Sequence, residues 1–455
     1  MALTKSTSFR ERLEALRPAG VRPGLDTIRA LLSALGNPQD ALRCVHVAGT
    51  NGKGAVCALV DSALCAAGYH TARFTSPHLL SVNERFCLDG QPVSDAVLAE
   101  VADEVFAAVD ALSLRGLVVT FFECLTAMAF VLFRKAAPDV VVLETGLGGR
   151  NDATNVLSDV LVSVVTRIGL DHCNWLGSTY AEIAGQKAGI LHPGRPAVCG
   201  AMPESARETV ARFASLDGCP FTAADEHVAV ERISPLVLTT PIRNPPPIAL
   251  ALEGAYQVEN AMTALAAIDV LCKDWGFHIS DMAVRTGFEQ VVWPGRFQRV
   301  VRDGVTFIVD GAHNPDGAMA LRDSLRSAHL NAPIAFVCGF CGDKDVLANL
   351  RVLSGVSMIG WAVPLTNTRS LDPAAVAERM AMAGFVSATA CASLEEGLSC
   401  ANAWAKDTGG TPVVCGSLFL AGEALLAMGA FPWTVRPPDA NELFPGVSAQ
   451  KQADR

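Results

Sequence analysis

Gly49-Thr-Asn-Gly-Lys53 stands between an apolar run, residues 42–48, and a stretch with the pattern of a helix. A strand that ends in a glycine-rich turn and continues as a helix can hold phosphate, because backbone N–H groups and the positive end of the helix point at the anion. Gly49 and Gly52 have no Cβ, so the backbone can approach a ligand closely. The segment therefore predicts an α/β fold with a phosphate-binding loop.

The loop departs from the strict phosphate-loop pattern, which has a glycine five positions before Gly-Lys and a hydroxyl residue after it. Val47 takes the first of these places, and Gly54 and Ala55 follow Lys53. A glycine-rich turn without a ligand is therefore the alternative interpretation of this segment by itself. Other parts of the chain decide between the two.

The composition bounds the class of protein. A chain of 455 residues with 50% apolar and 18% charged residues can form two or three compact domains. A net charge of −10 argues against a nucleic-acid surface, although a local pocket can still bind an anion. The N-terminal region lacks the apolar segment of a secretory signal, and no apolar run is long enough to span a membrane. We expect a cytoplasmic protein.

The 14 cysteines are scattered through apolar segments, which is typical of buried thiols in a reducing compartment. The pair Cys338 and Cys341 has no second pair or histidine at zinc spacing, so we expect core packing there and not a metal site.

Apolar runs that alternate with helical patterns predict a mostly parallel sheet covered by helices. The expected strands of the first part of the chain are residues 42–48, 139–145 and 160–168. A second series of strands begins after Trp293-Pro-Gly295 and comprises residues 305–310, 333–339, 358–363 and 412–415. We therefore expect a first domain over residues 1–296, a smaller α/β domain over 297–436 and a flexible tail over 437–455.

Polar clusters follow several expected strands, where open α/β sheets bind their ligands. They are Thr75-Ser-Pro-His78, residues 144–150, Asp171-His172 and residues 310–315. Nucleotide chemistry needs a divalent cation, and Mg²⁺ takes few protein ligands, mostly oxygens.

Glu144 is the best candidate for a protein ligand of that cation, because a carboxylate at the end of an apolar strand has little structural purpose. A helix cap or a surface ion pair is the alternative. Ser76 could supply the hydroxyl that is missing after Lys53, while His172 is equally consistent with a core histidine and with a ligand.

Eleven motifs across residues 20 to 425 resemble, in order, those of the bacterial bifunctional folylpolyglutamate synthase/dihydrofolate synthase family, which is related to the Mur ligases. The motifs are Gly49-Thr-Asn-Gly-Lys-Gly54, Thr75-Ser-Pro-His78, Phe121-Phe-Glu-Cys-Leu-Thr126, Glu144-Thr-Gly-Leu-Gly-Gly-Arg150, Asp152-Ala-Thr-Asn155, Leu170-Asp-His172, Lys187-Ala-Gly-Ile190, Trp293-Pro-Gly-Arg-Phe297, Asp310-Gly-Ala-His-Asn-Pro315, Asp343-Lys-Asp345 and Gly416-Ser-Leu-Phe-Leu420.

The resemblance implies a Mur-ligase-like ATPase domain with a phosphate loop, followed by a Rossmann-like C-terminal ligase domain. It also implies ATP-dependent amide-bond formation. ATP would phosphorylate a substrate carboxylate, and L-glutamate would attack the acyl phosphate. The substrates implied are dihydropteroate, reduced folates, L-glutamate and ATP, with no nucleic-acid or membrane partner.

The resemblance also assigns roles to residues of this chain. ATP would be bound by Gly49, Thr50, Asn51, Gly52, Lys53, Gly54, Asn260, Arg296 and Asp310. Two magnesium ions are implied, with Ser76, Glu144 and His172 as ligands. The catalytic residues would be Lys53, Lys187, Asp310 and His313, with Lys187 carbamylated by CO₂ to support the second metal. The pterin substrate would lie against Pro23, Gly24, Thr120, Phe121, Phe122, Glu123, Asn151, Asp152 and Ala153.

Four departures from the family pattern bear on function. Ala55 replaces a hydroxyl residue of the phosphate loop, Asn151 replaces leucine near the pterin, Gln186 replaces glutamate before the reactive lysine, and Tyr256 stands where histidine often precedes Gln257. None of them removes an expected metal ligand. They leave open a relative that has lost catalysis and binds nucleotide or folate only.

Two further alternatives concern the substrate. A Mur-type ligase of cell-wall precursors would need a UDP-sugar domain ahead of the loop, and only 48 residues precede Gly49. The chain could also have folylpolyglutamate synthase activity alone, but the Trp293–Gln298 stretch and the residues near Thr120 resemble bifunctional members. We expect both activities. We also expect a monomer, because the sequence shows no heptad pattern of a coiled coil.

Overall fold

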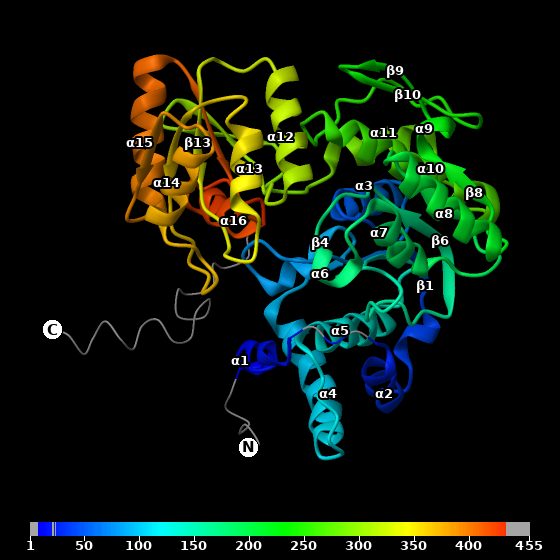
Figure 1. Ribbon diagram of the computed structural model, residues 1–455. Coiled ribbons are helices and arrows are strands. Elements are labelled where there is room, and N and C mark those ends of the chain that lie inside the picture. Colours follow the sequence, from blue (N-terminus) through cyan, green and yellow to red (C-terminus); the bar gives the residue numbers. More distant parts are fainter. Residues whose placement is uncertain (1–7, 21, 23, 434–455) are drawn as a thin grey trace.

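Two sheets form the framework of the computed structural model, which describes residues 8–20, 22 and 24–433 (Figure 1). Pro23 and the expected tail at 437–455 lie outside the described residues. The first sheet has eight strands in the order β4-β3-β2-β5-β1-β6-β7-β8. These strands are β1 (Arg43–Ala48), β2 (Thr71–Phe74), β3 (Phe86–Leu88), β4 (Gln91–Pro92), β5 (Val140–Glu144), β6 (Asp159–Val165), β7 (Ala197–Cys199) and β8 (Phe221–Ala223).

Six neighbouring strands of the first sheet are parallel, in the order β2-β5-β1-β6-β7-β8. Strands β3 and β4 extend the edge at β2 and pair in the antiparallel sense. We call this sheet and its helices the first lobe. Its helices are α1 (Phe9–Glu14), α2 (Asp26–Ala34), α3 (Lys53–Ala66), α4 (Asp95–Ser113), α5 (Phe121–Ala136), α6 (Cys173–Leu176), α7 (Tyr180–Lys187), α8 (Glu204–Leu216), α9 (Ala224–His227), α10 (Tyr256–Trp275) and α11 (Asp281–Gln290); a hairpin of β9 (Ala229–Ile233) and β10 (Leu236–Thr239) completes it.

Strand β5 shows why a continuous apolar run predicts a strand that is buried on both faces. Val140 and Val142 point to the face covered by α3, α10 and α11, whereas Val141 and Leu143 point to the face covered by α2, α4 and α5. Successive side chains of a strand alternate between faces, so both must be apolar when helices cover both.

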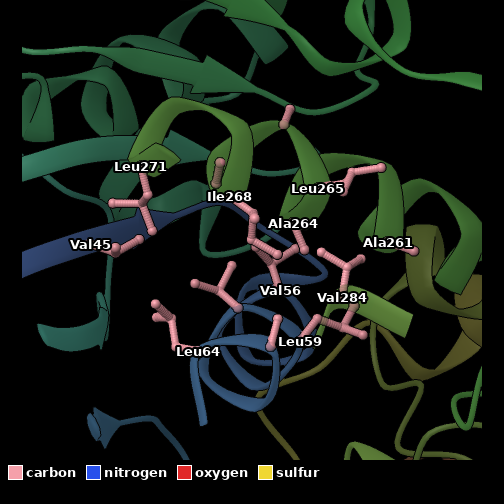
Figure 2. Close-up of a cluster of buried hydrophobic side chains, with 14 of the residues drawn as sticks. Val45, Val56, Leu59, Leu64, Ala261, Ala264, Leu265, Ile268, Leu271 and Val284 are labelled. Carbon is pink, nitrogen blue, oxygen red and sulfur yellow. The ribbon is translucent and has the colours of Figure 1, made fainter. Parts of the chain in front are cut away.

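Helix α3, which follows the phosphate loop, is anchored by this core (Figure 2). Val56, Leu59 and Leu64 of α3 meet Ala264 and Ile268 of α10, and each of these side chains is fully buried. The start of α3 is therefore held firmly at the end of β1, as a phosphate site requires.

The second sheet has six strands in the order β11-β12-β16-β13-β14-β15, and only the β11–β12 pair is antiparallel. With its helices, which run from yellow-green to red in Figure 1, it forms what we call the second lobe. The strands are β11 (Gln298–Arg302), β12 (Val305–Val309), β13 (Ile334–Cys338), β14 (Ile359–Ala362), β15 (Ser387–Ala390) and β16 (Thr411–Cys415), and the helices are α12 (Pro315–Ser327), α13 (Val346–Leu353), α14 (Pro373–Met382), α15 (Leu394–Thr408) and α16 (Leu418–Ala427).

The α/β fold class and all seven strands expected from apolar runs are confirmed, with ends that differ by up to three residues. The expected domain boundary between residues 296 and 297 falls between the two sheets, but the division into independent domains stays a prediction. Among the described residues, no helix is long and apolar enough to cross a membrane.

Candidate active site

Three neighbouring strands of the first sheet end at the same edge, and each carries polar residues there. β1 lies between β5 and β6; the phosphate loop follows β1, Glu144 ends β5, and Asp171-His172 follow β6. The carboxyl ends of parallel strands meet at one edge of a sheet, so residues distant in the sequence converge.

The phosphate loop is tightly packed against its surroundings. Gly52 has a φ of 89°, and a Cβ there would lie 2.3 Å from Asn260 Oδ1. Gly54 is equally constrained, because its Cβ would lie 2.1 Å from the Trp293 ring. Gly52 caps α3 without a side-chain acceptor, so the first N–H groups of this 14-residue helix remain available to an anion.

Lys53 folds back over the loop. Its Nζ donates to the carbonyl oxygens of Gly49 at 3.0 Å and Thr50 at 3.2 Å, and lies 3.8 Å from Glu144 Oε1. The geometry brings an ammonium, a carboxylate and the start of a helix together, as the sequence predicted.

Glu144 is 3% exposed, and its Oε2 accepts a 3.0 Å hydrogen bond from the backbone N–H of Ser76. Burial raises the pKa of this carboxyl, and the charge of Lys53 opposes the rise. A buried carboxylate with one oxygen free of a close hydrogen bond has the chemistry of a ligand for a hard cation.

Ser76 and His172 line the same cavity as Glu144. The described residues contain no cluster of three or more His, Cys, Asp or Glu side chains that could hold a metal by itself. A hydroxyl, a carboxylate and an imidazole around one cavity still fit Mg²⁺, because this ion keeps several waters and takes phosphate oxygens.

Lys187, at the end of α7, is 4% exposed and donates a 2.7 Å hydrogen bond to the carbonyl oxygen of Gly49. Burial lowers the pKa of this lysine well below its usual value, and the positive charge of Lys53 lowers it further. The structure thus favours a neutral amine here, which is the form that can react with CO₂.

The second lobe contributes residues from the ends of its three central strands. Asp310 follows β12, and its carboxylate accepts hydrogen bonds from Tyr256 Oη at 2.7 Å, Phe297 N at 2.8 Å and Ala312 N at 2.7 Å. Arg296 lines the cavity and donates to the carbonyl oxygen of Gly295 at 3.0 Å. Asp310 therefore also holds the connection between the lobes.

His313 binds the carbonyl oxygen of Gly311 through Nδ1 at 2.8 Å. Burial lowers the pKa of His313 to about 4, and the Lys344 cation adds to the effect. A neutral His313 whose Nδ1 donates has an unprotonated Nε2.

Asn260 is 7% exposed, and its Nδ2 donates to Gln257 Oε1 at 2.7 Å, beside the phosphate loop.

Two residues of the expected pterin wall are committed to capping α5. The Thr120 hydroxyl donates to Glu123 Oε2 at 2.7 Å and accepts from the Glu123 backbone N–H at 3.2 Å. This arrangement is a capping box, which satisfies free backbone N–H groups at the start of a helix, and both residues also line the cavity. Phe122 lines the cavity, whereas Phe121 is not among its lining residues and lies under the Arg17 guanidinium at 4.2 Å.

Asp152, in the same wall, is 4% exposed and receives hydrogen bonds from Leu147 N at 2.7 Å and from the backbone and hydroxyl of Thr154. It shapes the turn between Asn151 and Ala153, which both line the cavity.

One cavity of about 590 Å³ brings the predicted residues of both lobes together. Of the described residues predicted for the site, only Phe121 lies outside its lining. The lining set is Gly24, Gly49, Thr50, Asn51, Gly52, Lys53, Gly54, Ser76, Thr120, Phe122, Glu123, Glu144, Asn151, Asp152, Ala153, His172, Lys187, Asn260, Arg296, Asp310 and His313.

Several other residues line this cavity without a role predicted from the sequence. Asp171, Asn314, Lys344 and Ser417 stand inside motifs quoted above, so a signal for them existed. Arg369 stands in no such motif, and only the fold brings it to the cavity.

Comparison with known proteins agrees with this geometry. Residues 295–418 match the family described as Mur ligase, glutamate ligase domain. The chain is 37% identical over 346 residues to the dihydrofolate synthase/folylpolyglutamate synthase of Bacillus subtilis, a match that covers 74% of this chain and 80% of that protein.

Two solved structures share the fold over nearly the whole chain. Mycobacterium tuberculosis folylpolyglutamate synthase complexed with ADP is 34% identical with a TM-score of 0.86, and the match covers 93% of this chain and 99% of that one. Escherichia coli FolC in complex with DHPP and ADP is 30% identical with a TM-score of 0.83, covering 94% and 99%. Motif order, cavity and overall similarity agree, and the chain belongs to the dihydrofolate synthase/folylpolyglutamate synthase family of ATP-dependent ligases.

Proposed function

We propose that this protein joins L-glutamate to dihydropteroate, and to the γ-carboxylate of reduced folates, at the expense of ATP. The observation that carries the proposal is the single cavity between the lobes, where the phosphate loop, the buried Glu144 and the second-lobe residues Asp310 and His313 meet. ADP in the M. tuberculosis structure, and DHPP with ADP in the E. coli structure, support nucleotide and pterin ligands for this cavity.

The reaction follows from the chemistry of the groups. A carboxylate is a poor electrophile, because an oxide ion cannot leave it. An oxygen of the substrate carboxylate attacks the γ-phosphorus of ATP, and ADP leaves. The amine of L-glutamate then attacks the acyl carbon, loses a proton, and expels phosphate, which carries away the carboxylate oxygen. One amide bond forms for each ATP consumed.

The residues of the chain supply binding and charge. The N–H groups at the start of α3 and the Lys53 ammonium bind the phosphates, and Arg296 reaches them from the junction of the lobes. Asn51 and Gly52 belong to the loop, and Asn260 lies directly against Gly52. Mg²⁺, with Ser76, Glu144 and His172 as candidate ligands, offsets phosphate charge when it is bound.

We further propose that Lys187 is carbamylated. Burial lowers the pKa of its amine and so favours the neutral form that adds CO₂, and the resulting carbamate would supply an oxygen ligand for a second metal ion. The amine faces the phosphate loop through its bond to Gly49, so a carbamate here lies beside the phosphate site.

The proposed pterin site lies between Gly24, Phe122 and the Asn151–Ala153 turn. Asn151 and Ala153 supply polar and small surfaces beside the flat face of Phe122, which suits a pterin ring. We propose both synthase activities; folylpolyglutamate synthesis alone is the alternative. Turnover with dihydropteroate and with tetrahydrofolate monoglutamate, measured separately, distinguishes them.

The test of the proposed function is ATP turnover by the purified chain. ADP and phosphate should accumulate only when a pterin or folate acid and L-glutamate are both present. Turnover that ignores either substrate contradicts the proposal. We also propose that the enzyme is cytoplasmic and monomeric. Light scattering at assay concentration tests whether it is a monomer.

A further inference from the structure

Asp171 joins the two lobes at the mouth of the cavity. It follows β6 in the first lobe, and its side chain is 14% exposed. Its Oδ2 accepts a 2.9 Å hydrogen bond from Asn314 Nδ2, and its Oδ1 accepts a 3.2 Å bond from Lys344 Nζ. Both donors belong to the second lobe, so one first-lobe carboxylate holds two second-lobe side chains.

Both of these partners lie in the proposed active site. Asn314 Nδ2 also approaches Asn51 Oδ1 of the phosphate loop at 3.3 Å, and Asn314 Oδ1 caps α12 by accepting from Gly317 N at 2.7 Å. Lys344 follows β13 and lines the cavity with its side chain 16% exposed. The position of the Lys344 ammonium is therefore set by a carboxylate of the other lobe.

His313 belongs to the same group. Its Nε2 lies 3.9 Å from Asp171 Oδ2, beyond hydrogen-bond distance. Asp171 thus lies against the loops after β12 and β13 together, at two of the places where second-lobe residues line the cavity.

Another hydrogen bond joins the two lobes one residue earlier in the chain. The backbone N–H of Leu170 donates a 2.7 Å hydrogen bond to Asp316 Oδ2 at the start of α12. The lobes therefore have a connection here that does not involve Lys344, and it offers an internal comparison for Asp171.

We propose that Asp171 is a positioning residue that aligns Lys344 and Asn314 of the second lobe with the phosphate loop for the ligase reaction. The proposal rests on the proposed function for the reaction, and on the contacts above for the geometry. Small misplacements of groups around reacting atoms are costly, with about a 100-fold loss for a shift on the order of 1 Å. Asp171 therefore affects turnover more than nucleotide binding.

The experiment compares Asp171→Ala with Asp316→Ala, which removes the hydrogen bond to Leu170 and keeps the contacts of Asp171 with Asn314 and Lys344. Asp316 also lines the cavity, at the first turn of α12. We expect Asp171→Ala to lower kcat by about 100-fold, with KM for ATP and Kd for ADP within about threefold of the parent. Asp316→Ala should keep kcat within about threefold. Equal losses in the two variants, or a kcat for Asp171→Ala within threefold of the parent, would overturn the proposal. Asp171→Asn, which keeps the side-chain volume, replaces the alanine variant if that does not fold.

A double-mutant cycle tests whether Asp171 acts through Lys344. In the Lys344→Ala background, Asp171→Ala should lower kcat by a smaller factor than it does in the parent, because the carboxylate then positions Asn314 alone. Losses that multiply would contradict the mechanism.

Hydrogen exchange separates this proposal from the proposed function. Asp171→Ala should speed amide exchange in residues 341–346, and Asp316→Ala should not. If the parent binds ADP but forms no amide bond, the proposed function fails. The exchange result by itself then tests whether Asp171 positions the second-lobe residues. Unchanged exchange in Asp171→Ala would then contradict this role.

Discussion

Lys187 Nζ donates a 2.7 Å hydrogen bond to the carbonyl oxygen of Gly49, so the end of α7 is joined directly to the first residue of the phosphate loop. The bond holds a lysine whose pKa is lowered by burial beside the place where triphosphate charge would gather. A carbamylated lysine retains an N–H at Nζ, so the bond to Gly49 can survive the modification.

The first prediction concerns this lysine. Lys187→Arg should lower kcat by about 100-fold or more, because a guanidinium remains charged and cannot become a carbamate. The parent enzyme should lose activity in CO₂-depleted buffer and regain it with bicarbonate, whereas the variant should not respond. A carbamate carbon signal in the parent after addition of ¹³C-bicarbonate, absent in the variant, gives a readout that does not depend on turnover. Full activity of Lys187→Arg would exclude the modification.

Lys53 provides the second prediction. Lys53→Met keeps an unbranched side chain one atom shorter but removes the charge near Glu144, and kcat should fall by about 100- to 1000-fold. Lys135→Met is the matched control, because that lysine pairs with Glu100 and Glu104 on the surface of the first lobe. Steady-state ADP release measures both. Ligation that persists in Lys53→Met would show that the loop does not bind the transferred phosphate.

Gly146 permits a prediction about substrate choice. A Cβ at Gly146 would lie 2.4 Å from Phe122 Cζ, so Gly146→Ala should push the ring into the proposed pterin site. We expect KM for the pterin substrate to rise about tenfold, which corresponds to about 1.4 kcal/mol, while KM for ATP stays unchanged. Gly185→Ala in α7 is the control, since its Cβ would meet nothing closer than 3.6 Å. A parallel rise in both KM values would argue against a pterin at Phe122.

His46 predicts how stability depends on pH. Its side chain is fully buried, and its Nε2 lies 2.9 Å from Thr154 Oγ1. The Thr154 hydroxyl donates to Asp152 Oδ1, so His46 donates through Nε2 and its buried Nδ1 has no hydrogen-bond partner in the structure. Burial lowers the pKa of His46 from 6.5 to about 3.

The sign follows from linkage. Between pH 7 and pH 5 the unfolded chain binds a proton at His46 and the native protein does not, so the native state loses about 2 kcal/mol of stability as the pH falls. His46→Gln, which keeps a donor to Thr154, should remove that part of the loss. Urea unfolding of both proteins at pH 7 and pH 5 measures the difference. Equal pH dependence in the two proteins would show that His46 is not buried in its neutral form.

The apolar strands of the fold could be predicted because burial on both faces of a parallel sheet leaves a continuous apolar run in the sequence. β2 left no such run. Its Arg73 is 3% exposed and forms a 3.0 Å ion pair with Asp61, which is fully buried. A pattern of apolar residues cannot reveal a buried ion pair, since its stability depends on a partner from another element. β15 also escaped prediction, because an edge strand with exposed Ser387 and Thr389 has no apolar face to show.

The glycines of the phosphate loop and Glu144 could be singled out from the sequence because they stand in short segments whose chemistry is local, whereas Lys187 was singled out only by the resemblance of its motif to the family. The bond between Asp171 and Lys344 joins residues 173 positions apart, and no local pattern connects them. Thr120 and Glu123 line the cavity, and their contact with the pterin stays a prediction. The capping box gives these side chains a structural use that the motif by itself does not reveal.

The central claim is that ATP activates the acid by phosphorylating its carboxylate in the cavity between the lobes. It is tested most directly with dihydropteroate whose carboxylate oxygens are ¹⁸O. Mass spectrometry of the phosphate released during ligation of L-glutamate should find one ¹⁸O atom in each phosphate, in step with amide formation. Phosphate that carries no ¹⁸O while the amide product accumulates would contradict the account.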